Sequence, residues 1–126
     1  MEKTIPAGLR TTFLIHFLVG LVFGLIFLLF SELWGELVNW PATDPTIYRL
    51  LGAAILGYGV SSWFAYRETS WARVTILIQM EIIWTGLGAL VSLWGLIFEG
   101  IPAIGWLYAV LLAAFAVTFS VFYFRK

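Results

Sequence analysis

One long apolar run that contains a carboxylate constrains this chain most. Residues 75–98 read TILIQMEIIWTGLGALVSLWGLIF, a run long enough to cross a lipid bilayer. Steps of four and three from Glu81 give small or polar residues on one helical face, namely Thr85, Gly88, Ser92 and Gly95. In lipid, small residues let helix backbones approach, and polar residues seek partners on neighbouring helices. This face therefore predicts a protein neighbour along the whole helix.

The composition places the chain in a membrane. Its 126 residues are enough for one domain, 1–126, and 62% of them are hydrophobic and 11% charged. Soluble domains average roughly 45–50% apolar and about 25% charged residues. The formal net charge is zero, so we expect a lipid bilayer and no nucleic acid as partner. The chain has no cysteine, which excludes disulfides and thiolate metal sites.

Four apolar segments predict four transmembrane helices, at residues 12–30, 46–66, 71–98 and 103–124. Residues 31–45 form the only substantial predicted loop, with a short amphipathic turn along the membrane surface and Asp44 as a helix N-cap before Pro45. The other connections are short, which favours antiparallel neighbours. The predicted fold class is all-α, a polytopic membrane protein with four transmembrane helices in an antiparallel bundle.

Charged residues outside the apolar segments predict the orientation. One side of the predicted membrane carries most basic residues: Lys3, Arg10, Arg67, Arg73, Arg125 and Lys126. The other side carries Arg49 and the acidic residues Glu32, Glu36, Asp44 and Glu99. Because Lys and Arg accumulate in cytoplasmic loops, we expect a multi-pass protein of the inner or cytoplasmic membrane with both termini cytoplasmic.

Each predicted helix carries a stripe of small residues that we expect to pack against its neighbours. These helix-packing positions are Gly20, Gly24, Ala53, Gly57, Gly88, Gly105, Ala109 and Ala113. The same stripes carry one polar residue each, roughly 8–12 Å from the basic side at the helical rise. These four residues, His16, Ser61, Glu81 and Ser120, are predicted to form a buried polar layer.

The polar layer has three interpretations. It fixes helix packing through hydrogen bonds, or Glu81 carries protons or a small solute, or His16 ligates haem or a chlorophyll-type pigment. His16 is the single histidine of the chain and the only metal-ligand candidate, so it cannot form a bis-His haem site alone. No metal site or cofactor is predicted from the residues themselves. Catalytic, Walker and Rossmann motifs are not found, which predicts that the chain is not an enzyme.

Residues 48–66, YRLLGAAILGYGVSSWFAY, carry an Arg49 followed by Leu51-Gly52-Ala53 at the start of the second predicted helix. Trp63 stands at its exit, Arg73 in the basic turn, and Trp106 near the start of the fourth helix. In these features the chain resembles the DoxX-like small four-helix bacterial membrane proteins. The resemblance implies a four-helix architecture and kinship with a subunit of a thiosulfate–quinone oxidoreductase, and it implies no catalytic residue.

The sequence therefore favours a non-catalytic integral membrane protein, an accessory or structural subunit of a larger membrane complex with other membrane subunits as partners. One alternative is a redox or pigment-linked subunit that binds haem, quinone or chlorophyll through His16. A second alternative is a small proton-coupled transporter that uses Glu81.

Overall fold

The computed structural model describes residues 3–125, and that part of the chain is helical and contains no β-strand. The elements are α1 (Ala7–Leu29), α2 (Ser31–Leu37), α3 (Thr46–Arg67), α4 (Trp71–Trp94), the π-helical turn η1 (Gly95–Glu99) and α5 (Ile104–Phe124). The predicted all-α class is confirmed. The first helix begins earlier than predicted, at Ala7, and part of the predicted loop is the short helix α2.

Three helical segments are long and apolar enough to cross a membrane: Ala7–Leu29, Trp71–Glu99 and Ile104–Phe124. The third helix in chain order, α3, is of similar length but is less apolar and does not meet this criterion. Three apolar segments of this kind indicate a multi-pass membrane protein, as the composition predicts.

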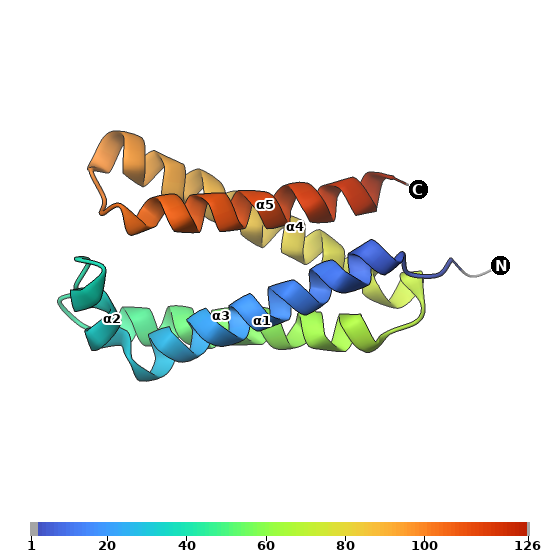
Figure 1. Ribbon diagram of the computed structural model, residues 1–126, viewed down its shortest axis with the longest axis horizontal. Coiled ribbons are helices and arrows are strands. Elements are labelled where there is room, and N and C mark those ends of the chain that lie inside the picture. Colours follow the sequence, from blue (N-terminus) through green and yellow to red (C-terminus); the bar gives the residue numbers. More distant parts are fainter. Residues whose placement is uncertain (1–2, 126) are drawn as a thin grey trace.

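The four long helices form two pairs (Figure 1). Helix α1 lies beside α3, and α4 lies beside α5, with the members of each pair running in opposite directions. Both chain termini lie at one end of the molecule, which we call the termini end; α2 and η1 lie at the opposite α2 end. The two pairs come together at the termini end and separate towards the α2 end, because α4 crosses from the lower pair to the upper one (Figure 1).

Glycines bring α1 and α3 together. A Cβ atom on Gly20 would lie 3.0 Å from the Cα atom of Gly59, and a Cβ on Gly52 would lie 2.7 Å from the backbone nitrogen of Leu28. A Cβ on Gly24 would lie 2.6 Å from the side chain of Leu56. The contacts at Gly20 and Gly52 are approaches of one backbone to another, and at Gly24 the Leu56 side chain fills the space of the missing Cβ; small residues promote helix pairing in lipid in this way.

The packing face of α3 differs from the predicted one. Ala53 and Gly57 are exposed, and a Cβ atom added to Gly57 would meet no atom within 4 Å. The stripe is rotated by one to two residues, so that the buried small residues of α3 are Gly52, Gly59, Ser62 and Ala65. Each residue turns a helix by about 100°, and a phase error of this size moves a whole stripe out of the interface.

Small residues of the second pair lie where α4, η1 and α5 meet. A Cβ on Gly88 would lie 2.9 Å from Leu112 of α5, and one on Gly105 would lie 2.6 Å from Ile101. Ala109 is 3% exposed, and Ala113 is half-buried. Gly88, Gly105 and Ala109 therefore face their neighbours as predicted.

An apolar core joins all four long helices at the termini end. It consists of Ile5, Leu9, Phe13, Ala65, Val74, Ile78, Phe115 and Phe119. The N-terminal segment closes this end, since the Trp71 backbone N–H donates to the Lys3 carbonyl over 3.0 Å and the Arg10 guanidinium donates to the Glu68 carbonyl over 3.0 Å. The connection between the two pairs is thereby held against the start of α1.

The loop before α3 has the predicted cap. The Asp44 carboxylate accepts a hydrogen bond from the backbone N–H of Thr46 over 2.9 Å, and this bond lowers the pKa of Asp44. Arg49 lies 3.6 Å from Glu32 in an exposed ion pair between α3 and α2. Exposed pairs of this kind contribute little free energy, so the aromatic contacts described below hold α2 in place.

The glycine contacts predict a contrast between two substitutions on one helix. Gly52→Ala should lower the free energy of unfolding by about 1–3 kcal/mol, because the new methyl group meets backbone atoms of α1. Gly57→Ala should be neutral or slightly stabilising, because the site is open and alanine is the better helix former. Unfolding in mild detergent measures both. Equal destabilisation by the two variants would contradict this α1–α3 interface.

Candidate functional site

Three helices contribute to a buried polar cluster, which we call the polar joint: His16 of α1, Ser62 of α3 and Glu81 of α4. The His16 Nδ1 and Ser62 Oγ atoms lie 2.8 Å apart, and the Ser62 hydroxyl donates to Glu81 Oε1 over 3.3 Å. The His16 Nε2 atom lies 3.1 Å from Glu81 Oε2, at ion-pair distance. The polar joint thus connects the α1–α3 pair with α4, the first helix of the second pair.

The proton arrangement of the polar joint follows from its geometry. Since the Ser62 hydroxyl donates to Glu81, His16 Nδ1 must carry a proton and donate to Ser62. Nε2 then faces the carboxylate, and a favourable contact needs one proton on Nε2 or on Oε2. The pair is therefore neutral as a whole in either state, as a site with a fully buried Glu81 requires.

Aromatic rings surround the histidine. Phe115 meets the His16 ring edge-on with centroids 4.8 Å apart, and the Phe119 centroid lies 5.7 Å away. Thr85 donates to the carbonyl of Glu81 over 2.5 Å, a bond within α4 that satisfies the hydroxyl. The site therefore excludes water on the side of α5 and offers the polar groups only one another.

Part of the predicted polar layer is brought together. His16 and Glu81 are in contact, and the Ser61 hydroxyl lies 3.5 Å from Glu81 Oε1 while it donates to the Tyr58 carbonyl over 2.6 Å. Ser120 is half-buried and forms no hydrogen bond with these residues in the described part of the chain, because the adjacent Phe119 occupies the core-facing position of α5. Ser62 was not predicted, because the stripe expected for α3 passed through its neighbour Ser61.

A cleft of about 710 Å³ lies between the two helix pairs. Its end nearest the polar joint is bounded by His16, Tyr58 and Trp84, and its middle by apolar side chains such as Phe23 and Leu111. No Lys, Arg, Asp or Glu side chain lines it in the described part of the chain. Its volume lies within the range of about 300–1,000 Å³ for small-molecule sites.

Aromatic side chains gather at the α2 end of the cleft. The Trp34 indole N–H donates to the Tyr108 hydroxyl over 2.9 Å, and the Trp40 ring stacks on Tyr108 with centroids 6.4 Å apart. The Tyr48 hydroxyl donates to the Trp40 carbonyl. Helix α2 and the loop after it are thereby attached to both α3 and α5.

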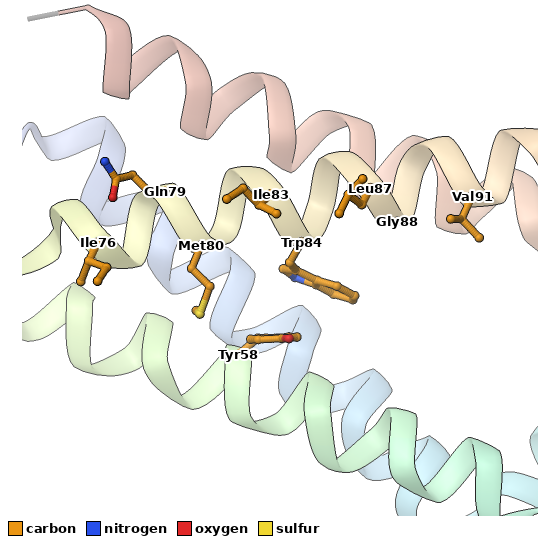
Figure 2. A pocket seen from close by; sticks show the side chains of 9 residues that line it. All are labelled: Tyr58, Ile76, Gln79, Met80, Ile83, Trp84, Leu87, Gly88 and Val91. Atoms are coloured by element: carbon orange, nitrogen blue, oxygen red, sulfur yellow. The ribbon is translucent and has the colours of Figure 1, made fainter.

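The cleft opens sideways between α3 and α4. Two of its lining residues, Ile47 of α3 and Val91 of α4, are 65% and 71% exposed. A second hollow, of about 650 Å³, lies on the same side against α4 (Figure 2). The rings of Tyr58 and Trp84 stack with centroids 4.9 Å apart and line both the cleft and this hollow. Figure 2 shows the two rings face to face between α3 and α4.

The positions of the two His16 ring nitrogens restrict which of the predicted ligands His16 can bind. Nδ1 is hydrogen-bonded to Ser62, and Nε2 lies 3.1 Å from the Glu81 carboxylate, so the iron of haem or the magnesium of a chlorophyll could reach Nε2 only by displacing that carboxylate. No group of three or more His, Cys, Asp or Glu residues that could hold a metal ion occurs in residues 3–125. A quinone, which needs hydrogen bonds and no metal ligand, is compatible with the cleft.

Comparisons with protein-family models, with curated proteins and with solved structures give no match to this chain. The resemblance to DoxX-like proteins therefore stays a prediction, and the function has to be inferred from the site itself.

The polar joint predicts how substitutions of Glu81 behave. Glu81→Gln keeps an acceptor for Ser62 and should be tolerated, whereas Glu81→Leu leaves the buried His16 and Ser62 without their partner and should cost about 1–3 kcal/mol. Glu99→Leu, at an exposed carboxylate, is the control and should change the free energy of unfolding by less than about 0.5 kcal/mol. If Glu81→Leu unfolds in detergent like the control, the polar joint does not hold the helices together.

Proposed function

We propose that this chain is a multi-pass membrane protein with four spans that binds a lipophilic small molecule in the cleft between its two helix pairs. The observation that carries the proposal is the form of the cleft: it is of ligand size, lined without carboxylates, ammonium or guanidinium groups, and open sideways between α3 and α4. A site of this kind receives its ligand from the hydrocarbon of the bilayer rather than from water.

The fourth span in this proposal is α3. It touches α1 from Gly52, beside Leu28, to Gly59, beside Gly20, and it therefore lies at the same depths as a helix that is apolar enough to cross. Its lower hydropathy reflects glycines and serines that face α1 and the polar joint. The four helices would then cross as two antiparallel pairs, with the basic termini end in the cytoplasm.

A small molecule fits the cleft better than a helix of a partner protein. A transmembrane helix is about 10 Å wide and about 30 Å long, and it needs a groove that is open at both ends. The polar joint stands at one end of this cleft, Trp40 and Tyr108 line its other end, and its volume of about 710 Å³ is that of a small-molecule site. That the chain is an accessory subunit of a larger complex stays a prediction. Partner subunits would contact the outer faces of the helices and not the cleft.

Binding without catalysis is the activity we infer. Glu81 is separated from the termini end by the apolar core, in which Leu9, Phe13 and Phe119 are fully buried. A proton carrier would need a polar route from Glu81 to that end, and no such route is present among the described residues. Of the ligands predicted for His16, the quinone class is the one that this cleft can take.

The topology is testable because the chain has no natural cysteine. Single-cysteine variants Glu36→Cys, Thr69→Cys and Glu99→Cys place a thiol in each of three exposed connections. In intact cells, a membrane-impermeant maleimide should label positions 36 and 99, and position 69 only after the membrane is opened. Labelling of 36 and 69 from the same side would show that α3 does not cross.

Ligand binding is tested by filling the cleft. Leu111→Trp adds bulk to a lining residue of α5, whereas Val110→Trp, on the 62% exposed adjacent position, is the matched control. Native mass spectrometry of the protein in mild detergent should detect one bound lipophile per chain in the wild type and in the control. Leu111→Trp should reduce the occupancy at least about tenfold, a loss of about 1.4 kcal/mol. Equal occupancy in both variants would overturn the proposal.

A further inference from the structure

One buried hydrogen-bond donor in the cleft wall has no acceptor. The indole N–H of Trp84 is buried and is not hydrogen-bonded to any described residue. Two other tryptophans have partners: Trp34 donates to Tyr108 over 2.9 Å, and Trp94 donates to Glu99 over 3.0 Å. Buried polar groups are nearly always hydrogen-bonded, so the exception at Trp84 requires an explanation.

The Trp84 ring lines the cleft at the end where a ligand would place its polar part, and because its N–H is buried, the ring has to turn before a ligand atom can reach it. It lines the cleft together with His16 and Tyr58, near the polar joint, while the side chains further along the cleft are largely apolar. The Tyr58 ring stacks on this indole with centroids 4.9 Å apart, and the Tyr58 hydroxyl also has no hydrogen bond to a described side chain or carbonyl. His16 offers no free nitrogen because both are engaged in the polar joint. Two donors are thus left at this end of the cleft.

The surroundings restrict the charge of the polar part. No cationic side chain lines the cleft to pair with a phosphate or carboxylate, and Glu81 is fully buried behind His16. Transfer of an unpaired charge into such a site is strongly unfavourable. The head group that fits is therefore uncharged and carries an oxygen that accepts hydrogen bonds.

We propose that the cleft selects a neutral lipophile whose head group bears a carbonyl or hydroxyl oxygen, with the Trp84 indole N–H as its first donor and the Tyr58 hydroxyl as its second. This proposal rests on the proposed function and specifies its ligand class. The apolar tail would run from this end towards Phe27. The lining residues of α1 extend from His16 to Phe27, a span of about 16 Å at the helical rise.

The test compares three probes with the same diprenyl tail: a naphthoquinone, the prenyl alcohol and the hydrocarbon without oxygen. The full chain in phosphatidylcholine nanodiscs should bind at least one of the two oxygenated probes at least about tenfold more tightly than the hydrocarbon. Tighter binding of the naphthoquinone assigns a carbonyl head group, and tighter binding of the alcohol assigns a hydroxyl head group.

Variants then assign the preference to its donors. Trp84→Phe should reduce the preference for the oxygenated probe by about tenfold and leave hydrocarbon binding unchanged, which also shows that the variant is folded. Tyr58→Phe keeps the ring stack and should reduce the preference by a smaller factor. Trp94→Phe, at an exposed tryptophan, is the control and should change nothing.

The outcomes separate this inference from the proposed function. If the wild type binds all three probes equally, or if Trp84→Phe retains the full preference while Leu111→Trp still blocks binding, the head-group assignment is overturned and the lipophile site stands. If no probe binds above the level of the Leu111→Trp variant, the cleft holds only bulk lipid chains, and both proposals fail.

Discussion

The contact between His16 and Glu81 is the interaction on which the arrangement of the helices depends. Within each pair, small residues bring the backbones together: Gly20 against Gly59, and Gly88 against Leu112. Between the pairs, the apolar core at the termini end and the polar joint beside it provide one contact, and Phe23 and Phe27 of α1 touch Tyr108 of α5 nearer the α2 end. In hydrocarbon, a His and a Glu have no alternative partner in water, so separating the pairs would expose both groups at a high cost.

Side-chain size then explains why the pairs do not meet along their full length. From the polar joint towards the α2 end, the facing positions are bulky, including Phe23, Phe27 and Tyr108, whose ring centroids lie 6.1 to 6.3 Å apart. Rings of this size hold the helices apart where glycines would let them approach. Small residues lie within each pair, and aromatic residues lie between the pairs. This one sequence feature divides the helices into two pairs and also creates the cleft.

The sequence predicts some of these features and not others. Long apolar runs such as residues 75–98 specify helices directly, and the scarcity of ionisable residues makes His16 and Glu81 natural partners. The phase of α3 could not be predicted, because small residues occur all round it, at Gly52, Ala53, Gly57, Gly59 and Ser62, and only the position of α1 decides which of them are buried. The prediction that Ser120 joins the polar layer was wrong for a similar reason, since the volume of Phe119 determines which face of α5 enters the core.

His16 links the polar joint to the cleft, since one edge of its ring contacts Ser62 and Glu81 while the ring also lines the cleft. A lipophile that occupies the cleft would contact lining residues of both helix pairs, such as Phe23 of α1 and Leu111 of α5, and would thereby add contacts between the pairs. Ligand binding and the association of the two helix pairs would then favour each other, as linkage requires for any ligand that binds only the assembled form. The structural role that we infer for Glu81 and the binding role that we propose for the cleft are therefore two consequences of one arrangement.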